Sequence, residues 1–453
     1  MIANSHDLLD RATVVHQQSD LKTYRDQGGI LMAKGDGVYV TDENGNRYLE
    51  AMAGLWCASL GFSEKRLADA AYKQMLELPY YHTFFHKGNL PSVELADKLL
   101  SIAPDGMSKV LFQCSGSEAN DAAIKLVWYY HDAIGKPEKK KIIGRVRGYH
   151  GNTVASVSAS GQPHMTAGFG LPLPMFKHTD NPNYYRFHLD GESEEAFSAR
   201  MADNLEKLIL AEGPETVGAF FAEPVQGGGG AITPPRGYFA AIQAVLKKYD
   251  ILFLADEVIC GFGRTGEMWG SQTYGLKPDM VSCAKALSAS YQPISALMIS
   301  EKIYEAMVAQ SAARGTFGHG FTYGGHPVAC AVALETLKIY EEMRIVDHVK
   351  AVSPLMQDGL KALEAHPLVG NARGVGLIAG VELMADKASR APFAPERKVG
   401  AMVEAECLKA GLIVRAIGDR IAFTPPLIIS PAEIKEMLAK FKTGLDAALA
   451  RIG

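Results

Sequence analysis

Polar and reactive side chains follow a series of short apolar runs that we predict to be β-strands. The runs lie near residues 109–113, 141–146, 217–222, 251–255 and 280–283. The residues that come after them are Ser115, Gly116 and Ser117, then Tyr149, Glu223, Asp256 and Lys285. In an open α/β sheet, ligands bind outside the carboxyl ends of the strands, where the loops converge. We therefore expect these residues to meet at one edge of a sheet.

Such a set of residues could bind an anion, a ring nitrogen and an aldehyde at once. A helix that starts after Ser115 and Gly116 would hold a phosphate through its free N–H groups and its dipole. A buried Asp256 would keep a heterocyclic nitrogen protonated, and Lys285 would form a Schiff base with an aldehyde. Tyr149 offers a flat face for stacking. Because pyridoxal 5′-phosphate (PLP) carries these three groups, the residues predict a PLP site.

Alternating strand and helix patterns must position these side chains. Predicted helices at 117–130, 193–212 and 238–248 lie between the runs above, and a further strand is expected at 294–299. The first helix begins with a candidate capping box, Ser115-x-x-Glu118. This alternation is typical of an α/β domain with a mostly parallel sheet flanked by helices.

The pattern of predicted helices and strands changes after about residue 326. A long helix at 328–342 precedes a segment that mixes helices with short strands at 376–383 and 412–416, which indicates a smaller α+β domain. Near the N-terminus, strands at 37–41 and 47–49 flank an Asn-Gly turn and predict a hairpin that packs on the C-terminal domain. We expect a segment at 1–60 packed with the small domain, a large domain at 61–327 and the small domain at 328–453.

Composition narrows the possible functions. A chain of 453 residues exceeds what a single hydrophobic core usually supports. A net charge of -4 lacks the basic excess of a nucleic-acid binder. The six cysteines form no C-x-x-C pair, so no metal site is predicted. No signal peptide or membrane-spanning run is recognisable, and we expect a soluble cytoplasmic protein.

Two glycine patterns could suggest a nicotinamide cofactor instead. Residues 261–266 satisfy G-x-G-x-x-G after a strand, but the following Glu-Met-Trp-Gly-Ser does not read as the required apolar helix. The weaker match at 374–380 precedes a strand rather than following one. We therefore set this interpretation aside.

Motifs spread along nearly the whole chain carry a resemblance to a known family. They are Ala51–Trp56, Ser115–Asn120, Gly148–Gly151, Phe221–Val225, Leu254–Gly266, Ala284–Leu287, His319–Pro327 and Leu412–Arg415. The chain resembles the class III aminotransferases, which are fold-type I PLP enzymes, and among them the ω-amine:pyruvate aminotransferases.

The resemblance implies a role for each matching residue. Lys285 would bind PLP covalently and then shuttle the substrate proton, and Asp256 would pair with the ring nitrogen. Tyr149 and Val258 would cover the two ring faces, and Glu223 would support the site from behind. Ser115, Gly116 and Ser117 would bind the phosphate. The structural alternatives are a surface lysine, a strand-end cap at Asp256 and a helix cap or buried salt bridge at Glu223.

The resemblance also implies a shared site and a dual-purpose substrate pocket. Thr322 would reach the phosphate of the neighbouring subunit's cofactor, so a homodimer with composite sites is expected, with a tetramer as the alternative. Trp56, Phe84 and Tyr149 would surround the amine's apolar group, and Arg415 would swing in to bind pyruvate's carboxylate. Core packing is the alternative for Trp56 and Phe84, a surface salt bridge for Arg415 and a turn for Thr322.

The resulting prediction is a ping-pong aminotransferase. It would move an amino group from a primary amine or ω-amino acid to pyruvate and form alanine and an aldehyde or ketone. Relatives use donors such as putrescine, β-alanine, taurine, 4-aminobutyrate and aromatic amines, and the sequence does not choose among them. The rival hypotheses are a decarboxylase or aminomutase on the same scaffold and a PLP-binding protein without turnover.

Overall fold

A seven-stranded sheet forms the centre of the larger part of the molecule. The computed structural model describes residues 5–452. The strands of this sheet are β4 (Met107–Gln113), β5 (Lys141–Arg145), β6 (Phe176–Thr179), β7 (Val217–Ala222), β8 (Leu252–Asp256), β9 (Met280–Cys283) and β10 (Ser295–Ser300). Their order is β4-β10-β9-β8-β7-β5-β6. Only β10 runs antiparallel to its neighbours, so the predicted mostly parallel sheet is confirmed.

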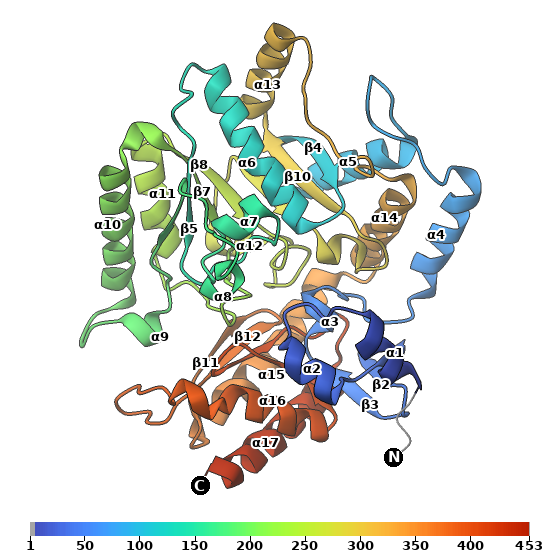
Figure 1. Cartoon of the computed structure of the whole chain (residues 1–453), viewed down its shortest axis with the longest axis vertical. Helices are drawn as coiled ribbons and strands as arrows, with labels where there is room; N and C mark the ends of the chain where they lie inside the picture. The colour runs from blue at the N-terminus through green and yellow to red at the C-terminus, as the bar shows by residue number, and fades with distance from the viewer. Residues whose placement is uncertain (1–4, 453) are drawn as a thin grey trace.

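Helices cover both faces of this sheet, and the strand sequences reflect it. On β7, Phe220 packs with Phe239 of α11 (Tyr238–Lys248) and with residues of α10 (Glu194–Glu212), whereas Phe221 packs with Leu126 of α6 (Gly116–Ala133). Successive strand residues point to opposite faces, so a strand buried on both sides must be apolar throughout. Figure 1 shows α10 and α11 on one side of the sheet and α6 on the other.

The remaining helices lie around these layers and along the N-terminal part of the chain. They are α1 (Ser5–Thr13), α2 (Leu21–Gln27), α3 (Ala53–Trp56), α4 (Lys65–Glu77), α5 (Leu90–Ile102), α7 (Val154–Ala159), α8 (Pro163–Thr166), α9 (Tyr184–Phe187), α12 (Gly270–Tyr274), α13 (Glu301–Arg314) and α14 (Pro327–Glu342). No helix within residues 5–452 is long and apolar enough to cross a membrane.

The C-terminal part builds an antiparallel sheet of its own. Its strands are β11 (Val369–Val375), β12 (Ile378–Leu383), β14 (Arg415–Ala416) and β15 (Arg420–Phe423), in the order β11-β12-β15-β14. Three long helices accompany it, α15 (Ile345–Ala362), α16 (Val399–Lys409) and α17 (Pro431–Ile452). This arrangement matches the predicted α+β character.

A third sheet joins the two ends of the chain. Its order is β1 (Met32–Asp36), β2 (Tyr39–Asp42), β3 (Arg47–Glu50) and β13 (Leu412–Ile413), and the predicted hairpin is its β2–β3 pair. In Figure 1, β2 and β3 lie beside the C-terminal elements. The domain boundaries at residues 60 and 327 stay a prediction.

The expectation of one strand over 412–416 is wrong. Leu412 pairs in parallel with Leu49 of β3, whereas Arg415 pairs with Ala422 of β15. The chain passes from one sheet to the other at Val414, so it forms two short strands. The apolar pattern of the segment is the same in either case, and it could not reveal which partners the strands would find.

Candidate active site

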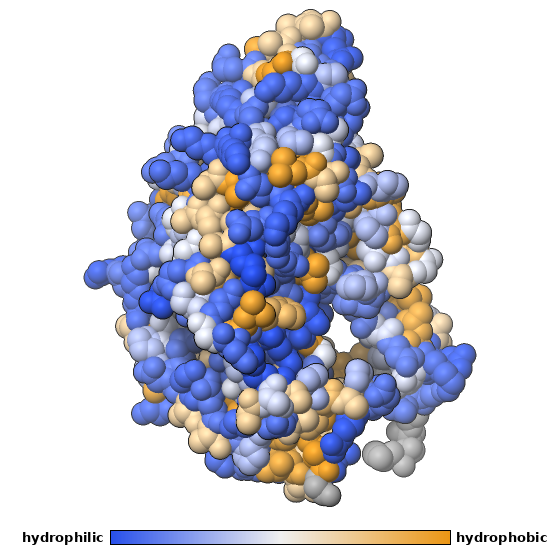
Figure 2. Space-filling model, turned by 90° about the vertical axis from the view of Figure 1, so that its left-hand side faces the viewer, coloured by the Kyte–Doolittle hydropathy of each residue, from blue (hydrophilic) through white to orange (hydrophobic). Residues whose placement is uncertain are grey.

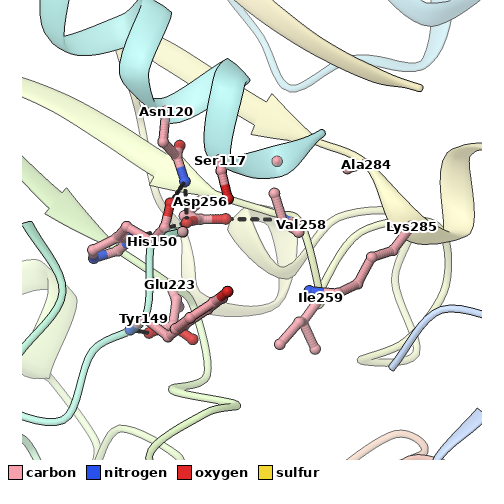
Figure 3. Close-up of a pocket in the computed structure, with 12 residues that line it drawn as sticks. Ser117, Asn120, Tyr149, His150, Glu223, Asp256, Val258, Ile259, Ala284 and Lys285 are labelled. Carbon is pink, nitrogen blue, oxygen red and sulfur yellow. Dashed lines mark hydrogen bonds and ion pairs between the residues drawn. The ribbon is translucent and has the colours of Figure 1, made fainter. Parts of the chain in front are cut away.

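A pocket lies at the carboxyl ends of the central strands, where the sequence places it. The residues that line it are Gly116, Ser117, Asn120, Tyr149, His150, Gly151, Glu223, Asp256, Val258, Ile259, Ala284 and Lys285. Figure 3 shows Lys285 reaching in from one side, opposite the group formed by Asn120, His150 and Asp256. The structure thus brings together most of the side chains that the sequence marks after separate strands.

Asp256 ends β8 and is held in a fixed orientation. Its carboxyl group is almost completely buried. Oδ2 accepts a hydrogen bond from Nδ2 of Asn120 at 2.7 Å and lies 2.8 Å from Nδ1 of His150, while Oδ1 accepts from the backbone N–H of Val258 at 3.1 Å. Each oxygen has a partner on the protein side, so the carboxylate is oriented before any ligand binds.

Lys285 follows β9 in a tight turn, with a φ of 49° that places it in the left-handed region. Burial lowers the pKa of its amine, and the nearby negative charges of Asp256 and Glu223 oppose that effect only in part. A lowered pKa means that more of the amine is neutral near pH 7. A neutral amine can attack a carbonyl carbon or accept a proton, which are the two tasks predicted for this lysine.

Glu223 ties two pocket loops together from behind. Its Oε1 accepts from the N–H of Tyr149 at 2.9 Å, and Oε2 accepts from the N–H of Gly227 at 2.9 Å. Burial raises the pKa of this carboxyl to about 7 and also raises the pKa of the Tyr149 phenol. Glu223 therefore acts on the pocket through the backbone of its neighbours.

The start of α6 forms the small-residue end of the pocket. The predicted capping box is present, because the hydroxyl of Ser115 accepts from the N–H of Glu118 at 3.2 Å. Gly116 and Ser117 line the pocket, and a Cβ on Gly116 would lie 3.0 Å from a methyl group of Val258. Ser115 uses its hydroxyl as the cap and does not line the pocket, although it was predicted beside the other two.

The other predicted residues lie outside this pocket. Trp56 is buried in an apolar cluster with Ile259. The ring of Phe84 packs against Gly320, since a Cβ added to that glycine would lie 2.6 Å from the ring. Arg415 is half-buried on β14, and its charge opposes the burial-driven rise in the pKa of Tyr149. Thr322 is exposed, and its carbonyl accepts from the hydroxyl of Tyr80 at 2.8 Å.

Asn120 and His150 are polar residues that line the pocket, and the sequence analysis gives neither of them a role. Asn120 donates both to Asp256 and to the carbonyl of His150 at 2.7 Å, so it joins α6 to the two strand ends. Asn120 stands four residues after Gly116, the spacing that puts two residues on one face of a helix. That spacing was the available signal.

Comparison with known proteins decides the family. A family model described as aminotransferase class-III matches residues 23–445. The chain belongs to the class III aminotransferases. Enzymes of this class are fold-type I enzymes and use PLP.

Named relatives of this aminotransferase include plant enzymes. Gamma-aminobutyrate transaminase 1, mitochondrial, of Oryza sativa subsp. indica is 51% identical over 448 residues, which are 99% of this chain and 86% of that protein. Gamma aminobutyrate transaminase 3, chloroplastic, of Solanum lycopersicum is 51% identical over 97% of this chain and 84% of its own length.

Solved structures of omega transaminases superimpose closely on this aminotransferase. The enzyme from Pseudomonas jessenii in complex with PMP is 51% identical, with a TM-score of 0.98 over 99% of each chain. A thermostable variant with a tryptophan, a phenylalanine and an arginine replaced, engineered for asymmetric synthesis of enantiopure bulky amines, is 50% identical with a TM-score of 0.98 over 99% of this chain and 100% of that chain.

The pocket of this aminotransferase fits PLP on chemical grounds. It offers a helix start with small residues, a buried carboxylate and a lysine amine with a lowered pKa, which suit a phosphate, a ring nitrogen and an aldehyde. Gly151, with a φ of 132°, packs directly against the start of α6, because a Cβ at this position would lie only 2.7 Å from Ser117. When bound, PLP supplies an electron sink for the bonding electrons of the substrate carbon.

Proposed function

We propose that this aminotransferase moves the amino group of a primary amine or ω-amino acid to pyruvate by a ping-pong mechanism. The products would be an aldehyde or ketone and alanine. The observation that carries the proposal is the placement of Lys285 opposite Asp256 in one pocket. The family and the omega transaminase neighbours support amine transfer, while the named plant relatives act on gamma-aminobutyrate, an ω-amino acid.

Each pocket residue has a proposed task in that reaction. Lys285 would hold the cofactor's carbonyl carbon and, once released, move the proton from the substrate carbon. Asp256 would keep the ring nitrogen protonated, with Asn120 and His150 fixing Oδ2 and the backbone N–H of Val258 fixing Oδ1. Gly116 and Ser117 would bind the phosphate, and Tyr149 and Val258 would enclose the ring.

The proposed roles of the substrate-binding residues rest on a comparison with the engineered omega transaminase. The tryptophan, phenylalanine and arginine replaced in the variant engineered for bulky amines are separated by the same intervals along the chain as Trp56, Phe84 and Arg415. Trp56 also packs against Ile259, which lines the pocket. We infer that Trp56 and Phe84 limit the size of the amine and that Arg415 binds the carboxylate of the keto acid.

A panel of donors and acceptors tests the overall reaction. Purified enzyme would be given 1-phenylethylamine, putrescine, β-alanine, taurine or 4-aminobutyrate with pyruvate or 2-oxoglutarate, and alanine or glutamate would be measured. We expect one alanine for each amine consumed. Amine consumption without alanine or glutamate would favour the decarboxylase or aminomutase, and an unchanged cofactor spectrum after amine addition would favour a binding protein without turnover.

Replacing Arg415 with alanine should separate the two half-reactions. The guanidinium is needed only when a carboxylate enters the pocket, so kcat/KM for pyruvate should fall about ten- to hundredfold. The single-turnover reaction with 1-phenylethylamine should change little. Arg397→Ala, which removes an exposed arginine of the same C-terminal part, is the control. Equal losses in both half-reactions would remove the proposed role.

Exposed apolar side chains on α4, on the segment after it and next to Thr322 favour the proposed homodimer. Tyr72, Leu76, Phe85, Leu90 and Tyr323 are each at least 60% exposed. The hydroxyl of Tyr80 and the amide of Asn89 bond to the carbonyls of Thr322 and Gly325, which joins this region to the threonine loop. By contrast, the side of the molecule over α10, which Figure 2 shows, is mostly hydrophilic with scattered apolar residues. A large apolar surface on a folded chain marks an interaction site.

Charges placed on that apolar surface should weaken the dimer. We expect the double variant Leu76→Asp/Phe85→Asp to shift toward monomer in light scattering and to lose activity at low protein concentration, because Thr322 of the second subunit is then missing. Leu189→Asp, on the loop after α9, is the matched control, since Leu189 is also exposed. A parent protein that is fully active as a monomer would contradict the composite site.

The place of the enzyme in the cell also stays a prediction. A cytoplasmic location is proposed, whereas the plant relatives are named as mitochondrial or chloroplastic. Fractionation of the source cells followed by immunoblotting would test it.

A further inference from the structure

An isolated acid lies beside the turn that carries Trp56. Glu50 ends β3 and is 3% exposed. Its backbone N–H donates to the carbonyl of Val38 at 2.9 Å, and its Cα is paired with Ile413 of β13, so the residue is fixed from both sides. Within residues 5–452 no cation lies within ion-pair distance of its carboxyl group. A buried acid without a cation calls for an explanation.

The partners of this carboxyl group are backbone N–H groups of the next turn. Oε1 accepts from the N–H of Met52 at 2.9 Å, and Oε2 accepts from the N–H of Gly54. Burial raises the pKa of Glu50 to about 7, and these two bonds counteract the rise only in part. The carboxyl group of Glu50 therefore holds the backbone of this turn in its conformation.

That turn has an unfavourable backbone. Ala53, Gly54 and Trp56 have φ values of 47°, 66° and 65°. Left-handed backbone costs about 1 to 2 kcal/mol for a residue that carries a Cβ, so such a conformation persists only where its surroundings hold it. Helix-like bonds, such as Trp56 N–H to the Met52 carbonyl at 2.8 Å, close the turn, and Glu50 binds its outer N–H groups.

The conformation of the turn decides where the indole of Trp56 lies. Trp56 is 4% exposed and belongs to an apolar cluster with Val225, Ile259 and Cys260. A Cβ on Gly227 would lie 3.6 Å from the indole ring, and Ile259 lines the pocket. A relaxed turn would move the indole relative to these neighbours and change the space next to the pocket.

We propose that Glu50 is a positioning residue for amine selection: by holding the N–H groups of Met52 and Gly54, it keeps the Trp56 indole against Ile259 and limits the size of the amine. The inference rests on the proposed amine donor. It extends the specificity determinants from the pocket wall to a side chain that does not touch the pocket.

The test compares Glu50→Ala and Glu50→Gln with a matched control in the same sheet. Asp42 is also a buried acid that holds a turn, because its Oδ1 accepts from the N–H groups of Asn44 at 2.9 Å and Asn46 at 2.8 Å. That turn closes the β2–β3 hairpin at the end opposite Glu50. Asp42→Ala should therefore cost stability without changing amine choice. Holoenzymes of all variants would be assayed with 1-phenylethylamine and with the smaller 2-aminobutane.

Glu50→Ala should raise the ratio of kcat/KM for the bulky over the small amine at least about fivefold. Glu50→Gln keeps one acceptor oxygen, so its ratio should lie between those of the parent and Glu50→Ala. This variant replaces Glu50→Ala in the test if the alanine variant does not fold. Hydrogen exchange, which does not depend on turnover, should accelerate in the peptide 50–58 for Glu50→Ala and in the peptide 42–48 for Asp42→Ala.

Two results would overturn the proposal. The first is a ratio of kcat/KM for the two amines that is the same in both Glu50 variants as in an active parent. The second is a rate of hydrogen exchange in the peptide 50–58 that does not change in Glu50→Ala. Failure of the proposed function is a different observation, because it would show as absent amine transfer in the parent itself, whatever the exchange data report.

Discussion

The transamination rate of Lys285→Ala should be at least about a thousandfold lower than that of the parent enzyme. The side chain enters the pocket from the turn after β9 and is the lysine that lines it, so no neighbour in that set replaces its amine. The measurement is the initial rate of alanine formation, together with the visible spectrum of the holoenzyme. Borohydride reduction of the parent, followed by peptide mapping, should label Lys285.

The alanine variant should still bind the cofactor without a covalent bond, because the carboxylate of Asp256 and the start of α6 are unchanged. Lys247→Ala removes an exposed lysine of α11 and should behave like the parent. Rates of Lys285→Ala within about tenfold of the parent would reject the assignment, as would a reduced parent with Lys285 unlabelled.

Asp256→Asn should lower kcat by about a hundred- to a thousandfold. The substitution keeps the size of the side chain but removes the negative charge that would stabilise a protonated ring nitrogen. The carboxylate now accepts from Asn120 and Val258, and an amide can satisfy those donors on one oxygen only. The readouts are single-turnover rates with 1-phenylethylamine and the absorbance maximum of the bound cofactor.

A stability measurement separates chemistry from folding in that variant. The melting temperature shows how much the lost hydrogen bond costs, and Asp250→Asn, at an exposed residue, gives the baseline. We expect the loss of kcat to exceed anything that the change in melting temperature explains. A stable variant with nearly parental kcat would mean that Asp256 only caps its strand.

Much of the fold could be predicted because buried strands are apolar on both faces. The runs that became β5, β7, β8 and β9 are of this kind, and the structure has them close to the predicted positions. β6 was missed, since its residues Lys177 and His178 are polar and it lies at the edge of the sheet, where burial does not impose an apolar pattern. β11 and β15 were missed within the smaller sheet.

The sequence predicts which loops meet at the pocket better than it predicts what each side chain does there. The rule that strand ends converge placed Asp256 and Lys285 in one pocket without knowledge of the turns between them. It could not decide whether the hydroxyl of Ser115 serves a ligand or the helix, because both uses favour serine there. Nor could it point to Asn120, one helical turn into α6, or to His150, whose partner Asp256 is distant in sequence.

The pairing of β3 with β13 has a consequence for anyone who redesigns this enzyme. Ala51, at the start of the segment that carries Trp56, donates its N–H to the carbonyl of Ile413, two residues before Arg415. Library screens that vary the tryptophan and the arginine separately would therefore miss combinations whose effects are not additive. Both positions belong in one randomised set, scored jointly.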